Sequence, residues 1–522
     1  MQAPRERSYD RDWLRVFPLS RARKFRAFHE TQAEPTMELD ALTADGHSEH
    51  NADVCIVGAG PAGLAVARAL VDRGRRIVLL ESGSDEAGDP GELNAGATEG
   101  GPINLRGSRA RAVGGTAAIW STIRGGVPGA KYVALDAIDF EQRDELPRSG
   151  WPFPRDALAP WYQHARALLG FADADTGALA RGNARHPRLP FLPDGLDSSI
   201  YLWGPAELFR RTIPEALRRH ERVMLIRNAT VTALVGAGGT GITSARWTTL
   251  SGTVGSVRAD HYIVAAGAIE NARLLLESGV HAGTEDAWLG RGLMEHPIDR
   301  SLTLTSRHPA LSPDAGYYAP FGAGGRAAAI GRIGCSDGML RHGHLWNASL
   351  RIFPAPERRL SRLARRVRHR IGGAPPTDYR VLLDLEQAPH PDNRVVLSEL
   401  RDQLGMRRAQ VHWKWREADE ANRGRMVAAM IRAFHDSRAG ELHHRADQPV
   451  DPDVHHHAGT TRMHADPRQG VVDPDLRVHG LGNLYVVGAS VFPTSGVANP
   501  MLTILALSLR LAEHLNGRAL GR

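Results

Sequence analysis

DVCIVGAGPAG, residues 53–63, decides the fold of this chain. Its apolar run, 54–57, predicts a buried strand, and the apolar spacing over 64–71 predicts a helix directly after the glycines. A second apolar run, 76–80, predicts the next strand, so the segment forms one strand–turn–helix–strand unit. In such a unit the G-x-G-x-x-G turn lets a diphosphate approach the N-terminus of the helix.

An acidic residue follows the second strand, where a dinucleotide presents its ribose. Glu81 lies 18 residues after Gly63, and a carboxylate there accepts hydrogen bonds from ribose hydroxyls. The alternative is a glycine-rich structural turn, which the flanking strands and the acid disfavour. An acid with no arginine beside it argues against a 2′-phosphate, but it does not separate FAD from NAD.

Two further turns favour FAD. Residues 265–268 (AAGA) end a later apolar strand and open a helix, as in two-domain flavoproteins where a second strand and turn close over the dinucleotide. Residues 111–116 (RAVGGT) offer a second glycine turn with free backbone N–H groups, for which an ordinary loop is the alternative.

Composition excludes several classes of protein. The 522 residues carry 65 basic and 58 acidic side chains, and the net charge of +7 is too small for this length to indicate nucleic-acid binding. Two cysteines, Cys55 and Cys335, exclude a disulfide scaffold and a multi-cysteine zinc site. No run reaches the ~20 apolar residues of a membrane-spanning helix, and no apolar segment follows the N-terminal arginines, so we expect a cytoplasmic protein.

Changes of pattern along the chain predict an α/β protein of four segments. We expect a polar, arginine-rich arm over 1–50 and a nucleotide-binding domain over 51–295, with an irregular glycine-rich insertion at 84–150. A separate sheet-containing domain is expected over 296–450. Residues 451–522 return to short glycine-punctuated strands and end in a helix.

The C-terminal segment carries an unusual string, HHHAGTTRM at 455–463. Successive side chains of an extended segment point to opposite faces, and no obvious set of carboxylates completes a site, so we predict no metal. A structural histidine is the plain alternative for any one of the three. Further on, Asn499 precedes Pro500 at the start of the final helix, where a helix cap is its plain alternative role.

Together, these two ends resemble the glucose–methanol–choline (GMC) flavin oxidoreductases, and more narrowly their pyranose oxidase and bacterial glycoside oxidase branch. The motifs that carry the resemblance are GAGPAG at 58–63, GAIENARLLLESG at 267–279, GRGLMEHP at 290–297, GTTRM at 459–463 and VVDPDLRVHGLGNLYVVGASVFPTSGVANPMLT at 471–503. The resemblance covers about residues 53–515. It implies a Rossmann-like FAD-binding fold, a sheet-containing substrate domain and FAD-dependent oxidation of an alcohol.

The resemblance also implies roles for single residues. In that family the histidine at the place of His456 is the catalytic base near flavin N5, and the second member of the pair, here Asn499, is a histidine or an asparagine. Oxidising an alcohol removes a proton from oxygen and a hydride from carbon, and a neutral imidazole suits the first task. The residues implied to contact FAD are Gly58, Gly60, Pro61, Ala62, Gly63, Glu81, Gly114, Gly115, Thr116, Ser121, Val231, Ala266, Gly267, Gly488, Ala489, Asn499, Pro500 and Met501.

One position departs from the fungal pyranose oxidases, which carry a histidine that bonds covalently to the flavin. The corresponding string here is GGTAAIWS at 114–121, with Ile119 at that place. Because isoleucine cannot form such a bond, we expect FAD to be held non-covalently.

The pyranose-oxidase-like ending favours a sugar or glycoside as the small-molecule alcohol, oxidised at a secondary alcohol, C2 or C3 of a pyranose, to a ketone. Gln387 is a candidate substrate contact, with a core or surface amide as the alternative. A dehydrogenase that tailors a non-sugar or natural-product intermediate is the runner-up, and a flavin-binding module without alcohol chemistry is a remote alternative.

Several features leave the choice between interpretations open. The electron acceptor is O2 or another molecule, so the chain is an oxidase or a dehydrogenase, and its oligomeric state is not indicated. The arginine-rich stretch 357–370 is either a docking surface for an acidic partner, an anionic membrane or an electron acceptor, or a solvated helix face.

Overall fold

The structure, a computed structural model, describes residues 37–517 except 44–46, 87–91, 102, 121, 125–126, 173, 206, 238–239, 281–287, 312–315, 323–327, 356–376 and 453. Ser121, predicted to contact FAD, and the arginine-rich stretch 357–370 lie outside the described residues. So do residues 1–36 of the predicted arm.

A mixed sheet, here the first sheet, contains the predicted strand–turn–helix–strand unit. Its strands are β1 (Glu38–Asp40), β2 (Ser48–Val57), β3 (Ile77–Leu80), β8 (Val223–Arg227), β9 (Thr230–Ala237), β10 (Gly241–Thr248), β11 (Val254–Val264) and β20 (Leu484–Val486). They follow the order β1-β8-β3-β2-β11-β10-β9, and β20 pairs with β11. All neighbours are parallel except that β10 runs antiparallel to both β11 and β9.

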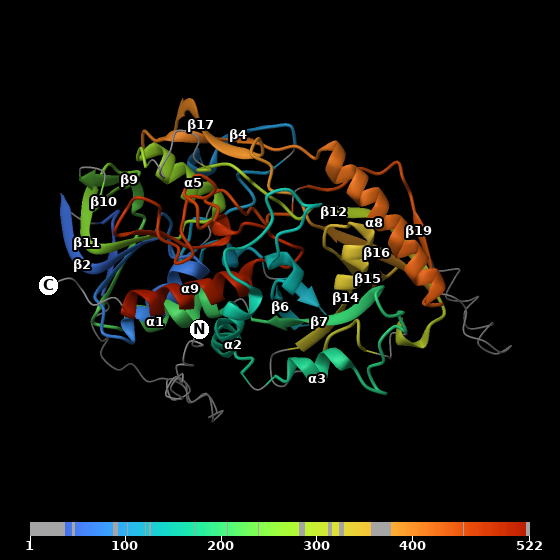
Figure 1. Ribbon diagram of the computed structural model, residues 1–522. Coiled ribbons are helices and arrows are strands. Elements are labelled where there is room, and N and C mark those ends of the chain that lie inside the picture. Colours follow the sequence, from blue (N-terminus) through green and yellow to red (C-terminus); the bar gives the residue numbers. More distant parts are fainter. Residues whose placement is uncertain are drawn as a thin grey trace, which may run out of the picture. The chain divides into compact units, whose positions relative to one another are not determined.

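This unit forms because its apolar residues are covered on both faces of the sheet. The last four residues of β2 and all of β3 are buried, as parallel strands require. The predicted helix is α1 (Pro61–Val71), and it packs against the final helix, α9 (Met501–Gly517). α9 also packs against α2 (Ala159–Leu168), and Figure 1 shows α1 and α9 side by side next to the first sheet.

A second sheet is antiparallel throughout. Its strands are β5 (Thr122–Arg124), β6 (Val127–Tyr132), β7 (Leu196–Gly204), β12 (Ile298–Ser306), β13 (Phe321–Gly322), β14 (Ala328–Cys335), β15 (Ala348–Pro354), β16 (Thr377–Leu385) and β19 (Glu441–His444). They follow the order β19-β12-β16-β15-β14-β7-β6-β5, with β13 paired to β14. The long helix α8 (Glu417–Asp436) buries Met430 and Phe434 in the same hydrophobic cluster as Leu383 of β16, and Figure 1 shows this helix beside the sheet.

The sheets include strands from across the predicted segment boundaries at three places. β5 to β7 of the second sheet precede the predicted boundary at 296. β17 (Arg394–Arg401) and β18 (Arg407–His412) are not part of that sheet. They form a small third sheet with β4 (Gly96–Glu99), a strand inside the predicted insertion. β1 and the start of β2 lie inside the predicted arm. All three pairings join residues that are far apart in sequence, and local patterns do not report such contacts.

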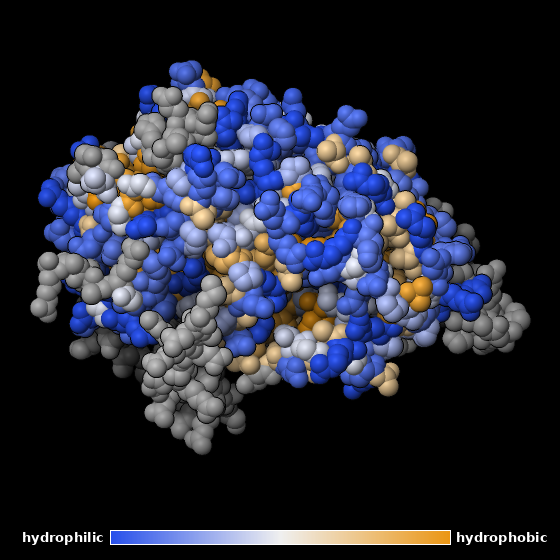
Figure 2. Space-filling view, in the orientation of Figure 1, coloured by the Kyte–Doolittle hydropathy of each residue, from blue (hydrophilic) through white to orange (hydrophobic). Residues whose placement is uncertain are grey.

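Further helices lie between the strands along the chain. They include α3 (Thr176–Arg181), α4 (Ile213–Arg218), α5 (Ala268–Glu277) and α6 (Asp337–Gly343), with 3-10 turns at Gly115–Ala118 and Ala489–Val491. No helix within the described ranges is long and apolar enough to cross a membrane. The face seen in Figure 2 is largely hydrophilic, and apolar side chains are visible mainly between polar ones.

Candidate active site

Three strands of the first sheet end side by side, and the turns that follow them meet. The backbone N–H of Ala265 donates to Val57 O (2.8 Å), and the N–H of Val487 donates to Val264 O (2.9 Å). Because these strands are parallel, the turns after β2, β11 and β20 lie at one edge, where open α/β sheets bind their ligands. The sequence predicted FAD contacts in all three turns.

Asn271, which sequence reasoning did not single out, joins two of these turns. Its Oδ1 accepts from the N–H of Ala266 (2.7 Å), and its Nδ2 donates to Ser490 Oγ (2.9 Å). The side chain is fully buried in α5, within the motif GAIENARLLLESG. Asn271 therefore ties the turn that contains Gly267 to the turn that contains Gly488.

Glycine is required at two positions of the first turn. Gly58 has φ +103°, and a Cβ there would lie 2.7 Å from Ala265 O. A Cβ on Gly63 would lie 2.0 Å from Gly58 O, so only glycine lets α1 approach the turn this closely. Pro61 is the first residue of α1, where its missing N–H costs nothing, and Ala62 follows it in the first helical turn.

The second glycine turn packs directly on the first. The N–H of Gly114 donates to Ala59 O (2.8 Å), and a Cβ on Gly115 would lie 2.8 Å from Gly60 Cα. Thr116 follows in the 3-10 turn that begins at Gly115. The two glycine motifs, which are 50 residues apart, therefore come together as one stretch of backbone.

Glu81 is fixed at the end of β3. Its Oε2 accepts from the N–H of Ala59 (2.8 Å) and its Oε1 from the N–H of Gly83 (2.9 Å), while burial raises the pKa of its carboxyl to about 7. The N–H of Ala229 donates to Glu81 O (2.8 Å), which brings the start of β9, with Val231, beside it. The two residues predicted at the adenosine end therefore lie close together.

An arginine lies near this acid, although none is close in sequence. Arg111 Nη1 donates to Ser82 Oγ (2.8 Å), and its positive charge acts to lower the pKa of Glu81 against the effect of burial. The same guanidinium donates to Asn94 Oδ1 (2.8 Å) and pairs with Glu270 (3.1 Å). Arg111 is thus already engaged by protein groups, so its presence does not argue for a 2′-phosphate.

Both predicted catalytic side chains meet at the far end of this edge. His456 Nε2 lies 3.0 Å from Asn499 Nδ2, across 43 residues of sequence. The segment that carries His456 is held against the turn after β20, because the N–H groups of Gly459 and Thr461 donate to Ala489 O (3.1 Å) and Ser490 O (2.8 Å). The amide of Asn499 makes the contact with the histidine. The next residue, Pro500, lies at the start of α9, where its carbonyl oxygen accepts from the N–H of Ile504 (2.9 Å).

Electrostatics keep His456 neutral. Burial, the adjacent His296, and the positive charges of Lys131 and Arg351 hold the pKa of His456 well below its usual value. An imidazole is a base only above its pKa, so this one has a lone pair available at neutral pH and below.

The three consecutive histidines have different surroundings. His455 is exposed, with φ +65°. His457 is buried, its Nε2 lies 3.2 Å from Glu295 Oε1, and burial lowers the pKa of its imidazole to about 3. Across the part of the chain that the structure describes, no three His, Cys, Asp or Glu side chains gather as metal ligands.

Two residues behind the catalytic pair had no predicted role. Glu295 is fully buried, and its Oε2 accepts from the N–H groups of His456 (3.0 Å) and His296 (3.3 Å). His296 Nδ1 lies 3.3 Å from His456 Nδ1, and its Nε2 lies 3.1 Å from Ser495 O. Both residues belong to the motif GRGLMEHP, which was quoted for the family resemblance but not assigned a function.

The side-chain amide of Gln387 forms hydrogen bonds inside the protein, next to Glu295. It is buried, and its Oε1 accepts from the N–H of Glu295 (3.1 Å) and from Trp413 Nε1 (2.9 Å). Its Nε2 donates to Lys414 O (3.3 Å). These bonds engage the oxygen twice and the nitrogen once, so they favour the alternative role of Gln387, a core amide, over a substrate contact.

Charged side chains from the second sheet lie near the catalytic pair. Lys131 Nζ of β6 is 4.0 Å from Asp384 Oδ2 of β16, and Arg351 Nε of β15 donates to the same carboxylate (2.8 Å). The N–H of Leu385 donates to Pro297 O (3.0 Å), so this end of β16 lies against the residue after His296. Charged side chains of the second sheet therefore act on His456 from nearby.

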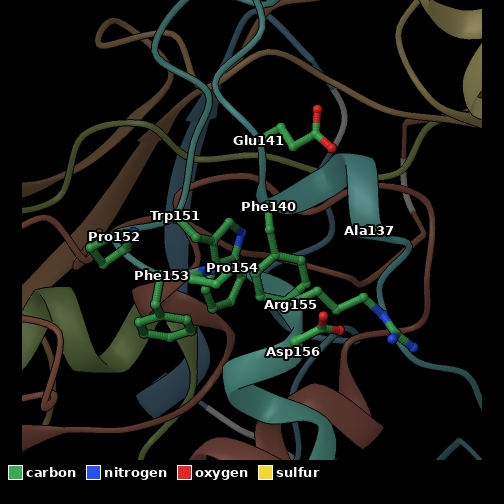
Figure 3. Close-up of a pocket in the computed structure, with 9 residues that line it drawn as sticks. All are labelled: Ala137, Phe140, Glu141, Trp151, Pro152, Phe153, Pro154, Arg155 and Asp156. Atoms are coloured by element: carbon green, nitrogen blue, oxygen red, sulfur yellow. The ribbon is translucent and has the colours of Figure 1, made fainter. Parts of the chain in front are cut away.

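A separate pocket of about 460 Å³ lies between residues 137–141 and 151–156, as Figure 3 shows. Its lining includes Trp151, whose ring centroid lies 4.6 Å from that of Phe140 and 5.3 Å from that of Phe492. Trp151 Nε1 donates to Thr494 Oγ1 (3.1 Å). Neither His456 nor Asn499 lines this pocket.

The glycine turns and Glu81 fit a bound dinucleotide. A Cβ on Gly58 or Gly63 would collide with protein backbone, whereas a Cβ on Gly60 would have only Gly115 Cα within 4 Å, at 3.9 Å, so the turn leaves space beside the backbone at Gly60. Trp120 Nε1, after the second glycine turn, and Ser495 Oγ, in the loop beside His296, are buried without a hydrogen-bond partner among the described residues. Unpaired polar atoms of this kind are suited to a polar ligand.

Comparisons with known proteins concern the family and the fold. Residues 389–508 match the family model described as GMC oxidoreductase, and residues 56–92 match the one described as NAD(P)-binding Rossmann-like domain. Paromamine 6′-oxidase of Streptomyces fradiae is 26% identical over 90% of this chain and 92% of that protein. C-glycoside 3-oxidase of Arthrobacter globiformis is 25% identical over 89% of this chain and 94% of that protein.

A solved structure shares the fold. The FAD-dependent oxidoreductase from Chaetomium thermophilum superposes with a TM-score of 0.55 at 15% identity, over 90% of this chain and 99% of that one. At this identity the likeness concerns the fold alone.

Proposed function

This chain belongs to the GMC flavin oxidoreductase family, and from that premise we propose that it oxidises a secondary alcohol of a sugar or glycoside, at C2 or C3 of a pyranose, to a ketone. The observation that carries the proposal is the 3.0 Å contact between His456 Nε2 and Asn499 Nδ2 at the edge where the glycine turns meet. FAD is the cofactor, and when bound it accepts the hydride that leaves the carbinol carbon.

The catalytic pair handles the hydroxyl group. His456 Nε2 takes the hydroxyl proton, which its low pKa permits because the imidazole is neutral before the reaction. Asn499 donates an amide hydrogen bond that orients the hydroxyl oxygen toward the base. After the transfer, the imidazolium of His456 places a positive charge where negative charge develops.

Residues at the edge of the first sheet would hold the cofactor. The diphosphate would bind the two packed glycine turns and the N-terminus of α1, formed by Gly58, Gly60, Pro61, Ala62, Gly63, Gly114, Gly115 and Thr116. Glu81 would accept from the ribose, with Val231 beside the adenine. The turns with Ala266, Gly267, Gly488 and Ala489 would contact the ribityl chain and diphosphate, and Pro500 and Met501 the ring.

We expect FAD to be released when the protein is denatured in acid. Ile119 stands where a covalent attachment would need a histidine, and its hydrocarbon side chain, 48% exposed, offers no nucleophile. The measurement is the absorbance of flavin in the supernatant after precipitation of the purified yellow protein with trichloroacetic acid. Flavin that stays with the pellet would contradict non-covalent binding, and a flavin-free protein would contradict the function itself.

The names of the relatives support a sugar-like substrate, and the two classes to compare are neutral glycosides and aminoglycosides. One relative is a C-glycoside 3-oxidase and another is a paromamine 6′-oxidase, so one acts on a glycoside and the other on an aminoglycoside. The charges near the catalytic pair favour the first, because Lys131 and Arg351 place positive potential at His456. A substrate ammonium group close to the reacting carbon would meet the same potential.

The matched substrates are a methyl glucoside and its 4-amino-4-deoxy analogue, which keeps both the C2 and the C3 hydroxyl groups. We expect the neutral glycoside to reduce the flavin with a kcat/KM about 10-fold higher, which corresponds to about 1.4 kcal/mol of charge repulsion. The N-acetylated analogue, which has the bulk without the charge, separates repulsion from size. Lys131→Met should narrow the gap, whereas an amino sugar that reacts as fast as the neutral glycoside would count against this assignment.

The two alternative functions predict different outcomes when reduction of the flavin is followed with the same sugars and other alcohols. A dehydrogenase that tailors a non-sugar alcohol would leave the flavin oxidised with all sugars and reduced by another alcohol class. A flavin-binding module would not be reduced by any alcohol. Readmitting air after reduction distinguishes O2 from another electron acceptor.

A further inference from the structure

His296 is placed behind His456 in a chain of hydrogen bonds. Its imidazole is almost fully buried, in the segment between Glu295 and β12. Nδ1 of His296 faces Nδ1 of His456 at 3.3 Å, and the other ring nitrogen, Nε2, faces Ser495 O at 3.1 Å. The two rings meet edge to face at an angle of 67°.

The direction of each hydrogen bond follows from the chemistry of the groups. A carbonyl oxygen only accepts, so the nitrogen of His296 that faces Ser495 O must carry a hydrogen. A neutral imidazole has one N–H, which leaves His296 Nδ1 with a lone pair. The facing nitrogen, Nδ1 of His456, must then donate, and this leaves Nε2 of His456 with a lone pair, on the side of Asn499.

We propose that His296 is a positioning residue that holds His456 in the tautomer whose Nε2 is the base. This inference rests on the proposed function, because it concerns the residue to which that function assigns the base. It requires His296 to be neutral, and burial, which lowers the pKa of its imidazole to about 4, keeps it so.

His296 also supports the product of the proton transfer. When His456 becomes an imidazolium, its Nδ1–H donates a charge-assisted hydrogen bond to His296 Nδ1, and such bonds are stronger than those of the neutral pair. Loss of the acceptor should therefore make His456 a weaker base. The other titratable groups that act on the two imidazoles are Lys131, Arg351 and His457 on His456, and Asp384, Glu386 and Lys131 on His296.

Two substitutions of His296 separate the acceptor from the bulk. His296→Leu fills the space but cannot accept, whereas His296→Asn can place an amide oxygen near the position of Nδ1. We expect His296→Leu to slow flavin reduction by a glycoside about 10- to 100-fold, by analogy with the loss that follows removal of the hydrogen-bond partner behind a metal-binding histidine. We expect the pH at which the rate is half-maximal to fall in this variant, and His296→Asn to recover most of the rate.

A spectroscopic readout does not depend on turnover. Long-range ¹H–¹⁵N spectra of the holoenzyme labelled at histidine distinguish a protonated ring nitrogen from one with a lone pair. The signal of His456 is assigned by its loss in His456→Ala. We expect its Nδ1 to be protonated and its Nε2 to carry the lone pair in the parent enzyme, and this preference to weaken in His296→Leu.

The outcomes separate this inference from the function on which it rests. If the parent enzyme is reduced by glycosides but His296→Leu keeps its rate and pH profile, the inference fails and the function stands. A parent spectrum with Nε2 of His456 protonated would overturn the inference even if His296→Leu does not fold. If no alcohol reduces the parent flavin, the function fails first.

Discussion

Replacing His456 by alanine is expected to slow reduction of the bound flavin about 10²- to 10⁴-fold, the usual contribution of a general base. The variant loses the ring nitrogen that lies 3.0 Å from Asn499 Nδ2, and the amide of Asn499 cannot take the hydroxyl proton in its place. The measurement is anaerobic stopped-flow mixing with a glycoside, following the visible absorbance of oxidised flavin. FAD content is measured on the same sample, so that lost chemistry is distinguished from lost cofactor.

The neighbouring histidine provides the matched control. His455 is exposed and has φ +65°, a conformation that asparagine tolerates well, so His455→Asn should keep the parent rate. A His456→Ala variant that binds FAD and reduces it at the parent rate would show that the base is another group.

Arg143→Met is expected to lower the free energy of unfolding by about 3–5 kcal/mol, the usual cost of leaving one partner of a buried ion pair alone. Arg143 donates to both oxygens of Glu386, at 2.9 and 2.7 Å, and the two side chains are 2% and 0% exposed. Glu386 also accepts from the N–H of Asn347 (2.8 Å). The substitution strands a carboxylate in a site that water does not reach, and denaturant unfolding followed by circular dichroism measures the loss.

Two further variants test the cause of this loss. Glu386→Gln in the Arg143→Met background removes the stranded charge while keeping an acceptor for Asn347, so it should restore much of the stability. Arg341→Met breaks an exposed pair with Glu141 and should change stability little. If Arg143→Met unfolds at the same denaturant concentration as the parent, the pair does not hold this region together.

Local chemistry explains which parts of the site were predictable. The turn at 58–63 and Glu81 are specified by residues next to each other along the chain, and the structure has them as βαβ geometry requires. The pairing of His456 with Asn499 was inferred from family resemblance, and the two side chains do meet. For the turn at 58–63, the spacing of the glycines alone is enough to predict the local backbone.

Contacts between distant segments explain what was missed. A polar residue at the end of a strand looks the same in sequence whether it faces a ligand or an internal partner. Gln387 was therefore a candidate for either role, and its amide binds Glu295 and Trp413. His296 appeared in a recognised motif, but its role depends on two atoms, His456 Nδ1 and Ser495 O, that are 160 and 199 residues away. Nothing in the residues around it indicates those partners.

The most direct test of the account is to identify the product formed from a neutral methyl glycoside, turned over with O2 or an artificial quinone as the electron acceptor. Carbon NMR distinguishes a ring ketone from an aldehyde at the primary carbon. We expect a ketone at C2 or C3, absent when His456→Ala replaces the parent enzyme under the same conditions. An aldehyde at C6, or a flavin that remains oxidised with every sugar offered, would contradict the assignment of secondary-alcohol chemistry to this site.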